Sequence, residues 1–424
     1  GGLTLAALSA PNGILWNCPH VLTQKIAAPA FTAEVTLDAR ALQIGEQAGF
    51  GLIGGQYRRK GAMTDELYLP DQGDGSYRNP VLCCDYSDPD VIRVGDTYYM
   101  TASSFNYVPG LPILTSADLV NWRLVNYALP NIPEPGYEIP RHACGVWAPA
   151  IRWHDGFFYI YYGMPDEGIY MVRAADACGQ WDAPKLVRAG KGLIDPCPFW
   201  DDDGRAYVIH AYANSRIGFK SRIGIFPMSA DGTHAIGEDK FLFDGTANHP
   251  TIEGPKVYKR DGWYYIFAPA GGVATGWQTV LRSRRIDGEY EDHIVLRQGN
   301  SRVNGPHQGA WVTAADGSDW FIHFQSRGLY GRVTHLQPMA WQADGWPMIG
   351  EPVAGETYGT PVERWRKPTE THQPPLSLQC SDDFADSLGL QWQFMGNWRV
   401  DFYAVDGGLT LAALSAPNGI LWNC

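Results

Sequence analysis

The feature that most constrains the fold is a hairpin pattern that occurs five times in the centre of the chain. Each copy is a β-branched or aromatic run, a tight turn containing Asp or Gly, and a second such run, which is typical of a β-hairpin. The copies are VIRVGDTYYM (91–100), IRWHDGFFYIYYG (151–163), PFWDDDGRAYVIHA (198–211), KVYKRDGWYYIFAP (256–269) and WVTAADGSDWFIHF (311–324). They recur at intervals of roughly 50–60 residues, the period range of blade-type repeats. The pattern predicts an all-β fold with a five-bladed β-propeller over 79–366.

The regions on either side of the repeat have a different pattern. Alternating strand sequences such as FTAEVTLDA (31–39) and LQWQF (390–394) indicate antiparallel strands with one buried face. We expect 1–57 and 380–424 to be two parts of one jelly-roll-like β-sandwich. The stretch 58–78 then forms a linker.

The two ends of the chain are identical. Residues 1–18 and 407–424 both read GGLTLAALSAPNGILWNC, whereas natural repeats drift. The second copy would continue smoothly into Pro19, and Met63 opens a polar stretch that resembles a native start. We therefore expect a circular permutant, with a natural tandem duplication as the alternative. Because one sandwich has a single place for the repeated strands, the spare copy predicts a homodimer or a strand-swapped oligomer.

Composition excludes several partners. The net charge is −12 and basic residues form no block, which argues against nucleic acid or an anionic membrane surface. No apolar run approaches the ~20 residues that a membrane-spanning helix needs. Eight cysteines without metal-ligand spacing, and the lack of a visible signal peptide, lead us to expect free thiols and a cytoplasmic protein. The 16 Trp and 22 Tyr are mostly core, but such a surplus also suits binding to sugar rings.

Three carboxylates have an unusual local sequence at the openings of predicted blades. Asp88 lies in YSDPD, Asp195 in LIDPCPF and Glu253 in TIEGPKVY, each followed by Pro directly or after one Gly. A single Asp-Pro is usually an ordinary turn. Because inner strands of different blades begin around one funnel, three such residues at matching places indicate a shared site. Paired carboxyl groups can supply the acid and the base that glycosidic bond hydrolysis requires.

The sequence around these carboxylates resembles glycoside hydrolase family 43, the β-xylosidases and α-L-arabinofuranosidases. The matching blocks are NPVLCCDYSDPDVIRVGDTYYMTASSFNYVPGLPILTSADLVNWR (79–123), GVWAPAI (145–151), LIDPCPFWDDDGR (193–205), TIEGPKVY (251–258) and YGRVTHLQPM (330–339). The resemblance implies a five-bladed propeller followed by a β-sandwich. It also implies an inverting, exo-acting glycosidase that releases xylose or arabinofuranose from short xylan- or arabinan-derived oligosaccharides.

The resemblance assigns roles to the three carboxylates. Asp88 looks like the general base that activates water, and Glu253 looks like the general acid. Asp195 looks like the residue that keeps the acid protonated and in place. A neighbouring carboxylate disfavours ionisation of Glu253, which is consistent with this division.

The same blocks suggest residues for sugar and metal binding. Trp147 and Phe105 look like walls of the −1 sugar pocket, although either could instead be blade core. Arg332 looks like a substrate-facing arginine near Glu253 and Asp195, the alternative being a surface ion pair. In several relatives a histidine at the place of His307 binds calcium in the central channel, with waters completing the shell. A buried, hydrogen-bonded histidine is the alternative.

Other functions predict different sequences. A non-catalytic carbohydrate-binding propeller would lack one of the three carboxylates. Sucrose-acting five-bladed enzymes, which retain configuration, would show Arg-Asp-Pro and Glu-Cys where this chain has Ile194-Asp195-Pro196 and Glu253-Gly254. The sequence leaves open an endo-acting arabinanase, a permuted scaffold with damaged activity, and the preference between xylose and arabinofuranose.

Overall fold

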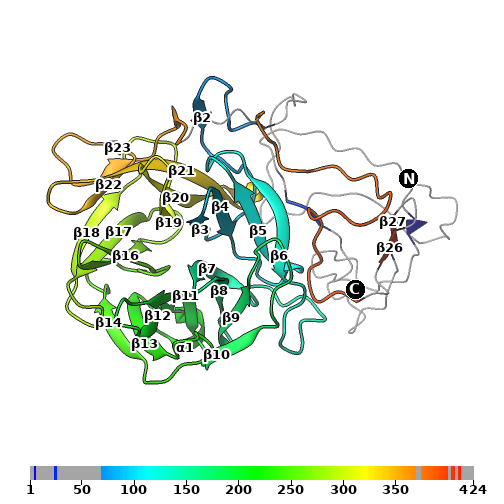
Figure 1. The fold of residues 1–424 in the computed structure, drawn as a ribbon, viewed down its shortest axis with the longest axis horizontal. Coiled ribbons are helices and arrows are strands. Elements are labelled where there is room, and N and C mark those ends of the chain that lie inside the picture. The colour runs from blue at the N-terminus through cyan, green and yellow to red at the C-terminus, as the bar shows by residue number, and fades with distance from the viewer. Residues whose placement is uncertain are drawn as a thin grey trace.

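The computed structural model describes residues 4–5, 23–25, 68–368, 374–399, 403–405 and 409–411. Within them, five antiparallel sheets surround a central axis (Figure 1). Each sheet uses four strands in chain order, and the sheet of blade 4 gains two further short strands. The five-bladed propeller predicted from the hairpin repeat is therefore confirmed.

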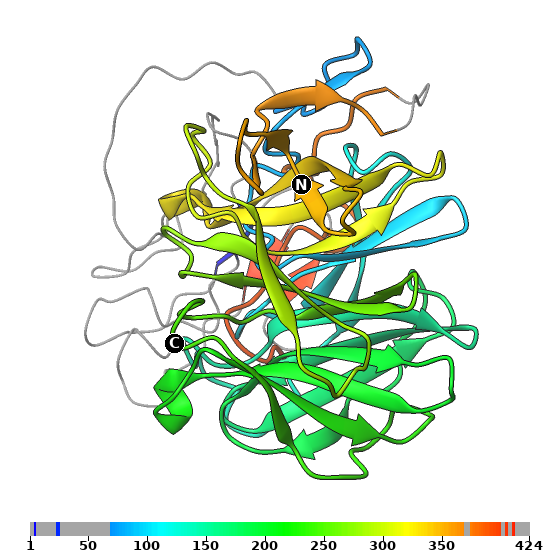
Figure 2. The same ribbon diagram turned by 90° about the vertical axis from the view of Figure 1, so that its left-hand side faces the viewer.

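The blades follow one another along the chain. Blade 1 consists of β3 (Asp90–Val94), β4 (Thr97–Thr101), β5 (Gly110–Ser116) and β6 (Arg123–Leu129). Blade 2 consists of β7 (Trp147–His154), β8 (Phe157–Met164), β9 (Gly168–Ala174) and β10 (Lys185–Ala189). Blade 3 consists of β11 (Leu193–Trp200), β12 (Ala206–Tyr212), β13 (Arg222–Met228) and β14 (Lys240–Asp244). The helix α1 (Asn214–Ile217) lies between β12 and β13 and protrudes at one face of the propeller (Figure 2).

The last two blades complete the ring. Blade 4 consists of β15 (Lys256–Arg260), β16 (Trp263–Ala270), β17 (Trp277–Ser283) and β18 (Glu291–Leu296), extended by β24 (Gly359–Thr360) and β23 (Glu351–Pro352). Blade 5 consists of β19 (His307–Thr313), β20 (Asp319–Ser326), β21 (Arg332–Trp341) and β22 (Pro347–Ile349), with the 3₁₀ turn η2 (Gly328–Tyr330) before β21. The first strand of each blade is the inner one, and β3 contacts both β7 and β19. The openings of the five inner strands therefore meet around the axis.

The core lies between the blades. Middle strands such as β8, with the sequence FFYIYYGM, are buried along nearly their whole length. Each blade packs against a neighbour on both faces, so both sides of these strands must be apolar. Phe267 of blade 4 and Phe321 of blade 5 show this contact, with ring centroids 5.8 Å apart.

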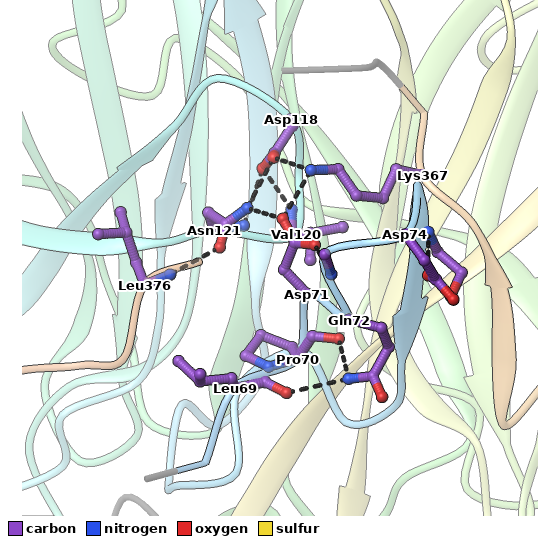
Figure 3. A network of polar contacts seen from close by, with 12 residues as sticks. Leu69, Pro70, Asp71, Gln72, Asp74, Asp118, Val120, Asn121, Lys367 and Leu376 are labelled. Atoms are coloured by element: carbon purple, nitrogen blue, oxygen red, sulfur yellow. Dashed lines mark hydrogen bonds and ion pairs between the residues drawn. The ribbon is translucent and has the colours of Figure 1, made fainter. Parts of the chain in front are cut away.

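The start and the end of the propeller are joined by backbone pairs and a polar cluster. Leu82 and Thr334 exchange backbone hydrogen bonds of 3.2 and 3.0 Å, and β2 (Ser76–Arg78) pairs with β25 (Arg364–Arg366). In the cluster, Lys367 Nζ lies 2.6 Å from Asp71 and 3.1 Å from Asp118 (Figure 3). All three side chains are almost fully buried, so this ion network fastens both ends of the ring to blade 1.

Little of the predicted sandwich falls within the described residues. Outside the ring, β26 (Tyr403–Val405) pairs antiparallel with β27 (Leu409–Leu411), and β27 pairs parallel with β1 (Thr4–Leu5). In the second pair the two copies of the repeated end face each other in register, Thr4 beside Thr410. Most of 1–57, the stretch 412–424 and Met63 lie outside the described residues. The sandwich and the circular permutation therefore stay predictions.

Two expectations from composition can be compared with the described residues. The cysteines among them are all free thiols: Cys83, Cys84, Cys144, Cys178, Cys197 and Cys380. Three of these, Cys83, Cys84 and Cys197, are buried, whereas Cys178 and Cys380 are exposed. Within the same ranges no helix has the length and apolar character needed to cross a membrane.

Candidate active site

Every inner strand has a kink near its start, where one residue adopts a left-handed backbone conformation. These kink residues are Asp88 (φ 55°), Ala148 (φ 36°), Asp195 (φ 56°), Gly254 (φ 58°) and Gln308 (φ 33°). The first four are followed by Pro and the last by Gly. Left-handed φ is costly for most L-residues, but Asp tolerates it better than most and Gly adopts it freely. The kink is thus a fivefold feature of the backbone that turns residues of different blades toward one site.

The carboxylates do not all occupy the same place in this repeat. Asp88 and Asp195 are themselves kink residues, whereas Glu253 is the residue before the kink at Gly254. His307 and Trp147 also precede a kink. The three carboxylates and His307 therefore all lie at the openings of blades, but Glu253 and His307 stand one residue earlier, relative to the kink, than Asp88 and Asp195.

Asp88 is buried but well supplied with hydrogen-bond donors. Its side chain is accessible for only a few per cent of its surface, and Oδ2 accepts hydrogen bonds from Ser103 Oγ at 2.6 Å and Ser87 Oγ at 3.0 Å. Oδ1 accepts a hydrogen bond from Arg332 Nη1 at 2.7 Å. Ser103 Oγ in turn accepts a hydrogen bond from the Ala148 backbone N–H at 2.7 Å, which connects Asp88 to the kink of blade 2. These donors stabilise the ionised carboxylate.

Arg332 belongs to the Asp88 side of the site. It is the first residue of β21, its backbone N–H donates to Asp85 Oδ1 at 2.9 Å, and its guanidinium carbon lies 4.6 Å from the Phe324 ring centroid. The sequence predicts an arginine near Glu253 and Asp195, and the charge of Arg332 does act on both carboxyl groups. The carboxylate with which it forms an ion pair is Asp88. Because Asp88 is buried, this ion pair is part of the site and not a surface pair.

Asp195 and Glu253 are joined through Gly254. The Gly254 backbone N–H donates to Asp195 Oδ2 at 2.8 Å, so the turn that carries Glu253 is held by Asp195. A side chain at position 254 would place its Cβ 2.6 Å from Gln308 Cδ, and the positive φ also favours glycine. Only glycine satisfies both conditions, which explains the Glu-Gly-Pro sequence.

The electrostatics of this pair favour a protonated Glu253. Burial raises the pKa of Glu253, and the charges of Asp195 and Asp88 raise it further, while Arg332 acts in the opposite direction. Burial and the charge of Asp88 also raise the pKa of Asp195, against the Gly254 hydrogen bond and the charge of Lys256. Lys256 is fully buried. Because Asp195 has a backbone donor and a buried cation close by, it carries the charge while Glu253 retains the proton.

His307 lies next to Glu253 at the axis. Its Nε2 is 3.5 Å from Glu253 Oε1, and its ring centroid is 5.4 Å from that of Phe324. Burial lowers the pKa of His307 to about 3, and the charge of Arg332 lowers it too, so the imidazole is neutral. Neither ring nitrogen has a hydrogen-bond partner among the described residues.

These features test whether the site suits calcium. An unpartnered, neutral ring nitrogen can bind a metal or a water, but calcium prefers oxygen ligands. The described part of the chain contains no group of three or more His, Cys, Asp or Glu side chains placed to hold a metal. His307 therefore fits a calcium ion only if waters supply most of the ligands.

Trp147 and Phe105 belong to two segments that are far apart in the sequence and whose backbones pair with each other. Phe105 and Val146 exchange backbone hydrogen bonds of 2.8 Å, which places Phe105 beside the residue that precedes Trp147. Both aromatic residues are half-buried. Trp147 Nε1 is buried without a partner in the described ranges, and the Arg216 guanidinium carbon lies 5.3 Å from the Trp147 ring centroid. Partial exposure and an unused donor are properties of a pocket wall more than of a blade core.

Sequence reasoning missed the groups that surround the carboxylates. Ser87 directly precedes Asp88, and Ser103 lies two residues before Phe105, so both fall inside recognised blocks without a signal of their own. Lys256 follows the Glu-Gly-Pro turn and reads as an ordinary strand-start lysine. The signal that could have found them was the Pro that follows four of the five kinks, which aligns the blades and points to the residues beside them.

The sequence and fold match known proteins. The model of Glycosyl hydrolases family 43 matches residues 77–347. A protein named "Putative beta-xylosidase" from Xylanibacter ruminicola is 47% identical over 354 residues, covering 82% of this chain and 65% of the relative. A non-reducing end alpha-L-arabinofuranosidase from Bacteroides ovatus is 33% identical over 357 residues, covering 78% of this chain and 63% of the relative.

A solved structure agrees with the fold. The xylan beta-1,4-xylosidase from Bacillus halodurans has a TM-score of 0.69 and 28% sequence identity, with 78% of this chain and 67% of that chain covered. The chain spans less than two thirds of the length of the two curated relatives.

Proposed function

The chain belongs to glycosyl hydrolase family 43, and on this premise we propose that it is an inverting, exo-acting glycosidase. Its proposed substrates are short xylan- or arabinan-derived oligosaccharides, from which it releases xylose or arabinofuranose. The names of the relatives support this substrate class. The observation that carries the proposal is the contrast between Asp88, whose carboxylate accepts hydrogen bonds from three donors, and Glu253, whose pKa is raised by burial and by the charges of Asp195 and Asp88.

The three carboxylates divide the reaction between them. Asp88 accepts a proton from a water molecule, whose oxygen attacks the anomeric carbon. The bond from that carbon to the leaving oxygen breaks, and Glu253 donates its proton to this oxygen. Asp195 stays ionised, and its charge raises the pKa of Glu253 by the largest amount next to burial. Asp195 also holds the Gly254 turn through its hydrogen bond. Attack by water opposite the leaving group inverts the anomeric configuration.

The remaining site residues bind the sugar. Trp147 and Phe105, both half-buried, form the walls against which the apolar face of the pentose packs. Arg332 orients Asp88 and presents its remaining N–H groups to the substrate. In this arrangement the sugar lies between the Asp88 side and the Glu253 side of the site.

Three substrates assayed side by side test the proposal. The chain is expected to cleave nitrophenyl xyloside or nitrophenyl arabinofuranoside, and to release only monosaccharide from linear arabinan. NMR of the first product formed is expected to show the inverted anomer. A retained anomer contradicts the mechanism, and internal cleavage of arabinan supports the endo-acting alternative. Binding without cleavage supports the carbohydrate-binding alternative.

We also propose a hydrated calcium ion at His307, whose ring nitrogens have no hydrogen-bond partner among the described residues and whose Nε2 lies 3.5 Å from Glu253 Oε1. Such an ion would contribute positive charge and rigidity, and no step of the reaction passes through it. Excess chelator is then expected to lower the melting temperature, and added calcium to restore it by mass action. An unchanged melting temperature would leave a buried neutral histidine.

The duplicated ends support a further proposal on assembly. If the chain is a circular permutant, the spare copy of residues 1–18 pairs with a second molecule and favours dimers. Light scattering is expected to give a larger mass for this chain than for a variant that lacks 1–18, with equal activity per chain. Equal masses would contradict the swapped assembly.

A further inference from the structure

The loop that carries Phe105 holds a conformation that it cannot keep by itself. Phe105 has a φ of 52°, a strained value for a bulky aromatic residue. On one side the loop is held by the backbone pair with Val146. The approach there is so close that a Cβ on Gly145 would lie 2.1 Å from the Phe105 carbonyl oxygen. Strain of this kind persists only where the surroundings determine the backbone from more than one side.

The second side is supplied by residues outside the propeller. The segment 393–397, which follows the last blade in the chain, makes a set of hydrogen bonds to the loop 104–109. These are Phe394 N–H to Val108 O at 2.7 Å, Val108 N–H to Phe394 O at 2.9 Å, Asn106 Nδ2 to Met395 O at 2.7 Å, and Gln393 Nε2 to Pro109 O at 2.8 Å. The loop therefore lies between blade 2 and the 393–397 segment.

The contact is buried. Asn106 is 2% exposed, and Phe394 and Met395 are also buried, so water cannot replace the Asn106 hydrogen bond. A buried amide that loses its partner is left unsatisfied, which favours a rearrangement of the loop.

The same segment also reaches the other wall of the pocket. The backbone N–H of Asn397 donates to Tyr137 O at 2.6 Å. The fully buried Tyr137 accepts, at its hydroxyl, a hydrogen bond from the Gly145 backbone N–H at 3.0 Å. Gly145 is two residues before Trp147. The 393–397 segment is thus connected to Phe105 through Asn106 and to Trp147 through Tyr137.

We infer that the 393–397 segment sets the width of the sugar pocket of the propeller, with Asn106 as the positioning residue that connects it to Phe105. The inference rests on the proposed function. Xylopyranose and arabinofuranose differ in ring size and shape, so a shift of the Phe105 wall changes their fit by different amounts. The propeller alone, without this segment, lacks one support of its own sugar pocket.

The test compares two variants that each remove one hydrogen bond to the stretch after the propeller. Asn106→Ala removes the bond to Met395 O. Tyr127→Phe is the matched control, because it removes only the bond from the Tyr127 hydroxyl of β6 to Leu390 O at 2.9 Å, away from the Phe105 loop. For each variant kcat/KM is measured on nitrophenyl xyloside and on nitrophenyl arabinofuranoside. The ratio of the two values does not depend on how much of the protein is folded.

Asn106→Ala is expected to change this ratio by about five-fold or more, within the discrimination that small changes of pocket shape produce. Tyr127→Phe is expected to leave it within about two-fold of the original, as for a pure stability effect. Asn106→Ser, which keeps a shorter donor, serves if Asn106→Ala does not fold, and should change the ratio in the same direction. Equal ratios in the original chain, in Tyr127→Phe and in the Asn106 variant would overturn the inference. Absence of cleavage by the unaltered chain would instead reject the proposed function on which it rests.

Discussion

Asp88 and Asp195 occupy the same position of two inner strands, with φ values of 55° and 56° and a proline after each. Their surroundings differ. The Asp88 carboxylate accepts hydrogen bonds from two serine hydroxyls and the Arg332 guanidinium, whereas Asp195 accepts one from a backbone N–H. The backbone repeat thus places an aspartate at the same kink position of two blades, and the neighbouring residues give the two carboxyl groups different numbers of hydrogen-bond donors.

The Asp195 side also carries the third carboxylate. Glu253 lies one residue before its kink, and His307 Nε2 is 3.5 Å from its Oε1 without a hydrogen bond. On this side two carboxyl groups lie close enough for their charges to interact, so one retains a proton, while on the other side the Asp88 carboxylate accepts three hydrogen bonds. The comparison supports the proposed base in blade 1 and the proposed acid in blade 4 from the number of donors around each carboxyl group.

The largest effect is expected for Asp88→Asn. Asparagine keeps the size of the side chain and tolerates the left-handed φ, but cannot accept a proton from water. We expect kcat/KM to fall by about 10²–10⁴-fold on natural and activated substrates alike, because a better leaving group does not replace the base. Added azide should restore turnover and yield a glycosyl azide of inverted configuration. An azide product of retained configuration would exclude Asp88 as the base.

Glu253→Gln should separate substrates by their leaving groups. Natural xylo-oligosaccharides need protonation of the leaving oxygen, so their cleavage should fall by about 10²–10³-fold. Nitrophenyl glycosides have better leaving groups and should lose less, about ten-fold or below. Parallel kinetics on both classes measure the difference. A loss by the same factor on both would show that Glu253 is not the acid.

Asp195→Asn should move the pH dependence in a known direction. Burial is the largest cause of the raised pKa of Glu253, and the charge of Asp195 is the second largest. Removing that charge therefore lowers the pKa of Glu253. Glu253 then loses its proton at lower pH, and the alkaline limb of kcat/KM against pH moves to lower pH. The maximum should fall by roughly ten- to a hundred-fold, within the range of acid catalysis. An alkaline limb that stays in place or moves upward would contradict the coupling of the two carboxylates.

The smallest effect is expected for Ser103→Ala, which removes one of the donors to Asp88. The lower limit for a hydrogen bond to a charged group is about 1.5 kcal/mol, and because two other donors to Asp88 remain, activity should fall by about ten-fold. Ser104→Ala is the matched control, because the neighbouring Ser104 hydroxyl accepts from the Leu111 N–H and does not contact Asp88. Steady-state kinetics of both variants make the comparison. Equal losses of activity in the two variants would mean that the single hydrogen bond from Ser103 to Asp88 does not contribute to catalysis.

Much of the propeller could be predicted from sequence because its signals are local. The hairpin turns, the alternation of apolar runs and their long period all reflect backbone conformation and burial within one blade. The three carboxylates were identifiable for the same reason, since Asp88, Asp195 and Glu253 are each followed by a proline, directly or after one glycine, at a kink. The position of Glu253 one residue before its kink was missed, because one sequence does not show which residue takes the left-handed φ.

The partners of the site residues could not be predicted in this way. Arg332 is 244 residues from Asp88 and was expected beside Glu253 and Asp195. It reaches Asp88 because the ring closes between Leu82 and Thr334, which brings the first and last blades together. The Asn106 bond to Met395, across 289 residues, depends in the same way on where the chain returns after the propeller.

The sequence by itself therefore determined the all-β repeat, the family and the three carboxylates, since sterics and burial periodicity act over a few neighbouring residues. Only the tertiary structure decided which donors and charges surround each carboxylate, and what supports the pocket walls. These properties depend on distances between charges and donors of different blades and on the exclusion of water around them. Both arise when the ring closes.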